Sequence, residues 1–208
     1  MSVAIHLPHR RRDPGPPEPP VGEVAVEIGP MRRRDVRSVV FIEERIFPRP
    51  WSSALYLSEL AQPATRAYYV ARAGGSVVGY AGCMLVAGEG HITTVGVAPA
   101  WQGRHIGMRL LHRLASDARA GGIEALTLEV RVSNRNAQAL YHQFGFAPAG
   151  IRKNYYAEVN EDGLVMWAHG LQQADYGERL RAIAARLDRP AGSTRPATPP
   201  GPDDDGAP

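Results

Sequence analysis

The chain has 208 residues, a formal net charge of +3 and a single cysteine, Cys83. One cysteine excludes an internal disulfide and fits a reducing compartment, so we expect a cytoplasmic protein; without a run of 18 apolar residues, or an apolar stretch after the N-terminal arginines, neither a membrane span nor a secretory signal is expected. The mild charge, and the lack of a basic stripe that alternates with aromatic residues, argue against direct nucleic-acid binding.

Composition divides the chain into a central domain and two proline-rich ends. Twelve of the eighteen prolines lie in the first 20 and the last 19 residues. We expect a disordered Pro/Arg-rich extension over 1–23 and a disordered Pro/Asp-rich tail over 189–208, because such segments bury too little apolar surface to offset the entropy of ordering. Residues 24–170 suit one domain. Residues 171–188 predict an amphipathic accessory helix, which packs either on the domain or on a partner.

The first half of the domain predicts a strand, two helices and a hairpin. Apolar residues alternate in the strands and recur at helical spacing in the helices. In chain order we expect a strand over 24–28, a helix over 36–47, a short helix capped by Ser52 or Ser53 and ending near Ala61, and strands over 68–72 and 77–86 joined at Gly74-Gly75.

The second half alternates strands with helices, which indicates βαβ units with parallel strands. We expect strands over 91–97, 125–132, 147–153 and 164–168, a helix over 106–118 stopped by Gly121-Gly122, a helix capped by Ser133 or Asn134 and closed by Gly145, and a last amphipathic helix over 176–187. Gly96 within a strand marks a bulge or the close approach of a ligand. The fold class is therefore mixed α/β, with a sheet that is antiparallel first and then parallel, and helices on both faces.

The turn over 102–107 joins a strand to a helix and is the first candidate site. Such a turn directs unpaired backbone N–H groups toward one point, where the helix dipole also favours an anion such as phosphate. No Lys-Ser/Thr pair follows Gly107, so this is not a Walker A loop, and the glycine spacing does not match a dinucleotide fingerprint. A plain strand-to-helix connection is the alternative.

The strand over 125–132 carries the second candidate site. Thr127, Glu129 and Arg131 lie on one of its faces, although a central parallel strand is usually apolar on both. Glu129 is either a carboxylate that lines a cleft or one half of a surface pair with Arg131 on an edge strand. Tyr141 lies on the apolar stripe of the next helix, where a buried core tyrosine is the simpler interpretation.

Histidines and the cysteine give little support to other chemistry. His91, His105, His112 and His142 lack the spacing of metal ligands, so we expect no metal site and assign them solvated or packed roles. Cys83 lies in a glycine-rich strand without an evident base and is not expected to be a nucleophile.

Several of these motifs resemble a known family. Val97-Ala98-Pro99 followed by Gln102-Gly103-Arg104-His105-Ile106-Gly107 resembles the acyl-CoA motif Q/R-x-x-G-x-G/A of the GNAT acetyltransferases. The later motifs resemble the RimI branch of that family, the ribosomal-protein-alanine N-acetyltransferases. These motifs are Leu128 to Asn134, Ala139-Leu140-Tyr141, Gly145-Phe146, Arg152 to Tyr156 and Glu161-Asp162, and the resemblance covers about 24–169.

The resemblance implies a GNAT fold, acetyl-CoA as co-substrate, Glu129 as general base and Tyr141 as general acid. It further implies two groups of binding residues. Those for acetyl-CoA are Val95, Gly96 and Val97 beside the pantetheine arm, Gly103, Arg104, His105, Ile106, Gly107 and Met108 around the pyrophosphate, and Asn134. Those for the acceptor groove are Pro50, Trp51, Ser52, Tyr155 and Tyr156.

Two positions depart from the family pattern. His105 stands where the motif usually has glycine, so the turn must accommodate a Cβ there. The segment before Trp51 is lengthened by Arg49-Pro50, which affects the shape of the acceptor entrance. The implied reaction is acetylation of the N-terminal amine of a ribosomal protein, with alanine as the expected N-terminal residue. Acetylation of lysine or a small amine, and a non-catalytic acyl-CoA-binding module, are the alternatives.

Overall fold

The computed structural model describes residues 15–20, 22 and 24–188. Most of the two expected disordered ends, residues 1–14 and 189–208, lies outside the described residues. Within the described part of the N-terminal end, the carbonyl of Pro17 accepts a hydrogen bond of 2.8 Å from the Trp101 indole and that of Gly22 one of 3.1 Å from Arg104. Across the described residues, none of the helices combines the length and the apolar character that a membrane span needs.

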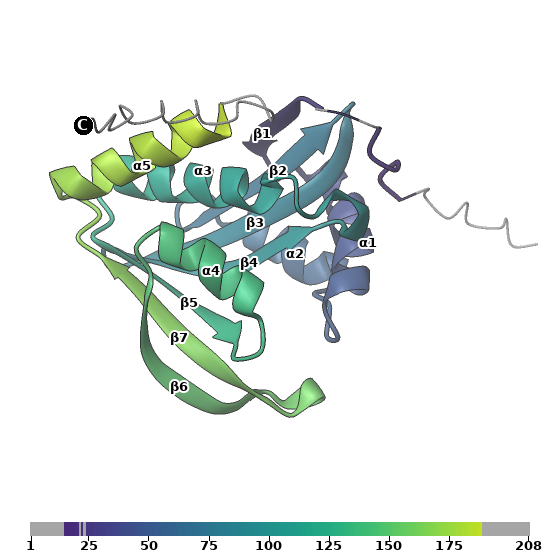
Figure 1. The fold of residues 1–208 in the computed structure, drawn as a ribbon. Coiled ribbons are helices and arrows are strands. Elements are labelled where there is room, and N and C mark those ends of the chain that lie inside the picture. Colours follow the sequence, from purple (N-terminus) through teal and green to yellow (C-terminus); the bar gives the residue numbers. More distant parts are fainter. Residues whose placement is uncertain (1–14, 21, 23, 189–208) are drawn as a thin grey trace, which may run out of the picture.

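Seven strands form one sheet in the order β1-β2-β3-β4-β5-β7-β6, which confirms the mixed α/β class (Figure 1). The strands are β1 (Val26–Pro30), β2 (Arg66–Ala73), β3 (Ser76–Val86), β4 (Glu89–Val97), β5 (Ala125–Arg131), β6 (Ala147–Tyr156) and β7 (Glu161–His169). The helices are α1 (Val36–Ile46), α2 (Ser53–Leu60), α3 (Ile106–Ala120), α4 (Arg135–Gln143) and α5 (Ala174–Leu187), with short 3-10 turns η1 (Arg33–Asp35), η2 (Pro99–Trp101) and η3 (Ala157–Val159).

The second half of the sheet differs from the expected run of parallel pairs. β4 and β5 form a parallel pair, as predicted for the first crossover. The second crossover, through α4, does not place β6 beside β5, because β7 lies between them and is antiparallel to both. The reason is local: η3 is a short connection, so β6 and β7 pair as a hairpin, and the free edge of β7 then pairs with β5.

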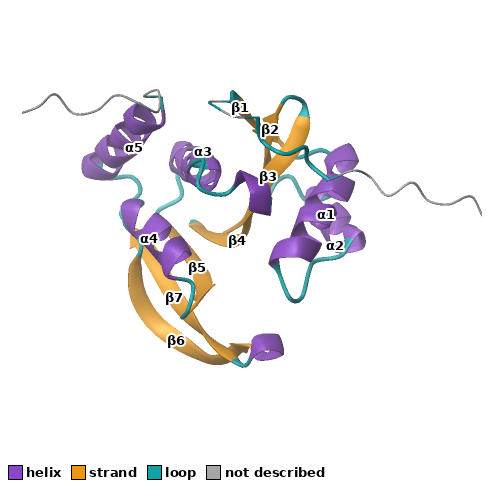
Figure 2. Cartoon of the chain, turned by 45° about the vertical axis from the view of Figure 1, so that its right-hand side comes forward, coloured by secondary structure: helices purple, strands orange, loops and turns teal. Residues whose placement is uncertain are grey.

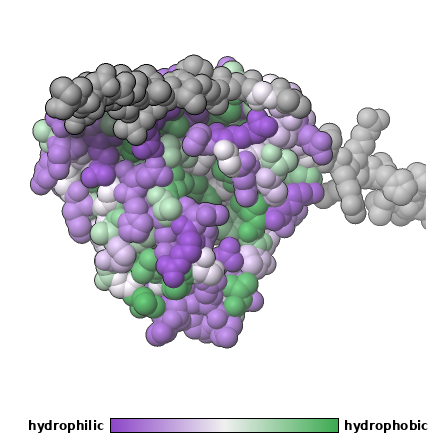
Figure 3. Space-filling view, in the orientation of Figure 1, coloured by the Kyte–Doolittle hydropathy of each residue, from purple (hydrophilic) through white to green (hydrophobic). Residues whose placement is uncertain are grey.

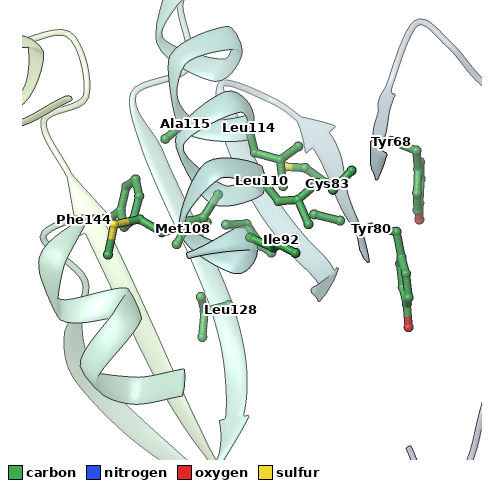
Figure 4. Packing of buried hydrophobic residues seen from close by; sticks show 14 of the residues in the cluster. Tyr68, Tyr80, Cys83, Ile92, Met108, Leu110, Leu114, Ala115, Leu128 and Phe144 are labelled. Carbon is green, nitrogen blue, oxygen red and sulfur yellow. The ribbon is translucent and has the colours of Figure 1, made fainter. Parts of the chain in front are cut away.

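Helices cover both faces of the sheet, as predicted (Figure 2). α3 packs on one face of β2, β3 and β4, and α1 packs on the other face of β3 and β4. Figure 4 shows Leu110, Leu114 and Met108 in the cluster that also holds Ile92 and Leu128 of the sheet. Figure 3 shows hydrophilic residues over most of the outer face, with apolar residues exposed between them.

The structure identifies the N-cap residues of α2 and α4 and the helix on which α5 packs. Ser52 caps α2, because its hydroxyl accepts the N–H of Leu55 at 3.2 Å. Asn134 caps α4 in the same way through Ala137, at 3.1 Å. The accessory helix α5 packs on α3 of the same domain, and the ring of His112 hydrogen-bonds to the carbonyl of Leu180 at 3.1 Å.

Candidate active site

The parallel pair β4/β5 is short, and the two strands part beyond it. Their register runs from Glu89 opposite Ala125 to His91 opposite Thr127 and ends there. Figure 1 shows that β4 and β5 diverge from each other. Residues 92–97 of β4 pair with β3 on one side and turn their other edge toward a gap. Backbone N–H and C=O groups along such an edge are the partners that an extended amide-containing chain requires.

The turn after β4 has the backbone geometry of an anion site. Gly103 has φ +77° and His105 has φ +58°, so His105 adopts the left-handed conformation immediately before α3. A left-handed residue followed by helical ones turns successive N–H groups inward. The side chains of Ile106 and Met108 pack in the core, and the first N–H groups of a helix have no partner within the helix itself. The Cβ of His105, the first departure from the family pattern, is accommodated by this strained backbone.

The glycines of this region have distinct steric roles. A Cβ on Gly107 would lie 3.4 Å from Leu140 and 3.9 Å from Val97, so a methyl group fits at this position with little space to spare. A Cβ on Gly96 would lie 2.5 Å from the ring of Tyr80. Gly96 is therefore required by the packing of Tyr80, and the bulge that its presence suggested lies further back in β4.

That bulge is at Thr93, and it decides where His91 points. Gly82 pairs with Thr94 and Cys83 with Ile92, so Thr93 is an extra residue in β4. Alternation counted back from Val97 would place His91 on the α3 face of the sheet, the face on which Gly79, the partner of Val97, approaches Ile106. The bulge reverses this, and His91 shares the opposite face with its partner Met84.

A cavity of about 540 Å³ lies at the gap between β4 and β5. Glu129 and Tyr141, which stand on different elements, both line it, as do Val95 and Asn134. Of the expected acceptor residues, Trp51, Tyr155 and Tyr156 line the cavity, whereas Pro50 and Ser52 are not among the described residues that line it.

The side chain of Glu129 is little exposed and is held on both sides, by His91 and by Arg152. Its Oε2 lies 2.7 Å from Nε2 of His91 and its Oε1 lies 3.1 Å from Nη1 of Arg152, while 5% of its side chain is exposed. The hydrogen bond from His91 is the largest cause that lowers the pKa of Glu129; burial raises it, and the charges of His91 and Arg152 lower it further. Glu129 is therefore ionised at neutral pH, and β5 is an internal strand.

Tyr141 keeps its proton at neutral pH. Burial raises the pKa of its phenol to about 12. Its ring packs against Phe146 with centroids 5.8 Å apart, which fixes the direction of the side chain. Tyr141 therefore both packs in the core and lines the cavity.

Three polar residues of the site are not identified by the sequence. Its patterns give His91 a solvated or packed role, place Arg152 in a family motif without a role, and do not single out Glu43. Glu43 is 2% exposed, lines the cavity and accepts hydrogen bonds from the hydroxyls of Tyr56, at 2.9 Å, and Tyr80. Burial raises its pKa. Its position on the apolar stripe of α1, three and four residues from Val40 and Val39, was the available signal.

Comparison with known proteins identifies relatives of the whole domain. Residues 36–146 match the family model described as the acetyltransferase (GNAT) family. The N-alpha-acetyltransferase RimI of Mycobacterium tuberculosis is 40% identical over 147 residues, which cover 68% of this chain and 90% of that protein. The ribosomal protein bS18-alanine N-acetyltransferase of Escherichia coli is 31% identical over 141 residues, covering 67% and 94%. The crystal structure of the ribosomal-protein-S18-alanine N-acetyltransferase from Escherichia coli superposes with a TM-score of 0.66 at 30% identity, covering 72% of this chain and 96% of that one.

Proposed function

The chain belongs to the GNAT acetyltransferase family, and we propose that it acetylates the N-terminal amine of a protein, with a ribosomal protein that begins with alanine as the acceptor. The chain is an acyltransferase, and acetyl-CoA is the acetyl donor of this family. The relatives from Mycobacterium tuberculosis and Escherichia coli are named for N-alpha or alanine acetylation. A ribosomal acceptor implies that the reaction takes place in the cytoplasm.

One observation supports this proposal above the others: Glu129 and Tyr141 line a single cavity beside the gap between β4 and β5. When bound, acetyl-CoA supplies an acetyl thioester. Residues 95–97 bind along its extended arm, the amides of residues 103–108 hold its phosphate end, and Asn134 also contacts it. Glu129 supplies the negative charge that assists deprotonation of the acceptor amine, and Tyr141 holds a proton for the departing thiolate. These two roles together require the acceptor amine and the donor to be present at the same time.

Direct transfer also agrees with the state of the one cysteine. Cys83 is buried, and burial raises the pKa of its thiol to about 12. A thiol with such a pKa is a poor nucleophile at neutral pH. The acetyl group therefore passes to the amine without an acyl-cysteine stage.

An α-amine is the easier acceptor on energetic grounds. An α-amino group has a pKa near ~7.8, against ~10.4 for lysine, so its neutral form costs roughly 3.5 kcal/mol less at a given pH. The carboxylate of Glu129, which stays ionised, is suited to a cationic amine that must then lose a proton.

Thiol release from acetyl-CoA tests the proposal against its alternatives. We expect release with a peptide that has a free N-terminal alanine, and little release with the same peptide when its N-terminus is blocked and lysine is the remaining amine. Equal release from the blocked peptide would favour a lysine acetyltransferase. Acetyl-CoA binding without release from any peptide or polyamine would favour a binding module.

A further inference from the structure

His91 is the last residue of β4 in register with β5, and it forms a hydrogen bond with Glu129, two residues beyond its partner Thr127. The distance from Nε2 of His91 to Oε2 of Glu129 is 2.7 Å. The two side chains differ in exposure, 30% for His91 and 5% for Glu129, and both line the cavity. The imidazole, more than the carboxylate, is the part of this pair that meets a molecule entering the cavity.

The carboxylate of Glu129 is poorly placed to receive a proton itself. One of its oxygens is bound by His91 and the other by Arg152. Both contacts favour its ionised form and lower its pKa. Imidazole is the side chain that most often serves as a general base in enzymes.

The hydrogen bond also prepares the imidazole for this role. A carboxylate that accepts the proton of Nε2 fixes the tautomer in which Nδ1 carries the lone pair. The bulge at Thr93 is what brings the ring to this face of the sheet, because regular alternation would turn it toward α3. The position of His91 therefore depends on two separate features, the bulge and the carboxylate.

We propose that His91 is the group that receives the proton of the acceptor amine, and that Glu129 orients the ring and stabilises its charged form. The proton leaves the ammonium nitrogen for Nδ1 of His91, directly or through one water. The freed lone pair of the amine then forms the new N–C bond as the C–S bond breaks. This inference rests on the proposed function and refines the role given there to Glu129.

Other charged groups surround the cavity and bear on any pH dependence. The carboxylates that line it are Glu43, Glu129 and Glu158. The cations are Arg49 and Arg131, which line it too, and Arg152, which is paired with Glu129. The phenols of Tyr141, Tyr155 and Tyr156 have raised pKa values and stay protonated near neutral pH. Burial raises the pKa of Glu43, so this residue is the competing source of a titration above the ordinary range of a glutamate.

The test compares His91→Gln with wild type, since glutamine keeps an amide donor for Glu129 but does not titrate. With both substrates saturating, we measure kcat from pH 5.5 to 9 and the Kd of acetyl-CoA by calorimetry. We expect kcat to fall by about 10²-fold or more, the acid limb that the imidazole produces to disappear, and the Kd to stay within about twofold. The acid limb should persist in Glu43→Gln. A His91→Gln enzyme with wild-type kcat and the same limb would overturn the proposal.

A second variant separates a chemical role from a structural one. We expect His91→Ala to be slow and to regain activity when imidazole is added, because free imidazole can occupy the vacated space and accept the proton. Folded His91→Ala enzyme without such rescue would count against the proposal. Failure of this inference can be told apart from failure of the proposed function. Wild-type enzyme without activity on the alanine peptide would refute the proposed function. An inactive Glu129→Gln variant beside a fully active His91→Gln variant would refute only the role of His91.

Discussion

Arg152 of β6 binds Glu129 of β5 across the intervening strand β7, with 3.1 Å between Nη1 and Oε1. The β7 residue opposite Arg152 is Gly163, where a Cβ would lie 3.0 Å from the side chain of Tyr155. Its missing side chain leaves room for the cavity tyrosine. With His91 on the other side, Glu129 is fixed by residues from both flanks of β5.

Replacing Glu129 by glutamine should abolish most activity while it preserves cofactor binding. Glu129→Gln keeps the side-chain volume but removes the charge that orients His91. We expect kcat with an N-terminal alanine peptide to fall by about 10²–10⁴-fold and the Kd of acetyl-CoA to change little. The matched control is Glu89→Gln, an exposed carboxylate at the start of β4, which should behave as wild type. Unchanged turnover in Glu129→Gln would refute its role, and the same assay applied to Tyr141→Phe tests the proton donor.

Substitutions of Gly107 should weaken acetyl-CoA binding through their side chains, and alanine there should do so without loss of stability. A methyl group at Gly107 meets Leu140 at an ordinary contact distance, and alanine favours a helix over glycine by up to about 1 kcal/mol. We therefore expect Gly107→Ala to hold or raise the unfolding free energy and yet to weaken acetyl-CoA binding at least tenfold. Gly107→Trp should abolish it.

Gly29→Ala, at the distant strand β1, is the control and should leave binding unchanged. Calorimetry reports the affinity, and urea denaturation reports the stability. Wild-type affinity in Gly107→Trp would show that acetyl-CoA lies elsewhere.

The left-handed backbone at His105 should be detectable as strain. A non-glycine residue in this conformation costs roughly 1–2 kcal/mol. Replacement by glycine removes this cost, but glycine also has more freedom in the unfolded chain, which offsets part of the gain. His105 is exposed and its φ is +58°. We expect His105→Gly to be about 1 kcal/mol more stable than His105→Ala in urea denaturation. An alanine variant as stable as the glycine variant would contradict the strain.

Glu43 should make stability depend on pH in a defined direction. Burial raises its pKa in the folded state above the ordinary value of 4.5, so the folded protein binds this proton more tightly than the unfolded chain does. The resulting stabilisation is complete below pH 4.5 and is lost as the pH rises through the raised folded pKa. The unfolding free energy of wild type minus that of Glu43→Gln should therefore fall as the pH rises.

Glu44→Gln provides the control, because Glu44 is the exposed neighbour of Glu43 on α1. Its difference from wild type should stay flat over the same pH range. A difference for Glu43→Gln that grows with pH would mean that the folded protein favours the ionised form of Glu43.

Elements whose patterns are local could be predicted well from the sequence. The helix α3 begins at Ile106, as its apolar spacing indicates, and α1 ends at Ile46, one residue before the expected end. The antiparallel first half of the sheet follows from the Gly74-Gly75 turn. Glu129 was found because a polar face on an apolar strand is visible in the sequence itself.

Features that depend on distant pairing could not be predicted. The extra residue Thr93 leaves the pattern of β4 unremarkable, yet it moves His91 to the face of Glu129. The insertion of β7 beside β5 depends on which edge the hairpin presents, and Arg152 meets Glu129 only as a result. Glu43 stands on a helix whose other buried residues are mostly apolar, and only its contacts with Tyr56 and Tyr80 explain its burial.

The central claim is that this cavity acetylates an α-amine. The most direct measurement is tandem mass spectrometry of one peptide that carries a free N-terminal alanine and an internal lysine, after incubation with the wild-type protein and acetyl-CoA. We predict a single added acetyl group on the alanine nitrogen, absent from the product of Glu129→Gln. Acetyl groups found on the lysine, with the alanine amine left free, would contradict the account.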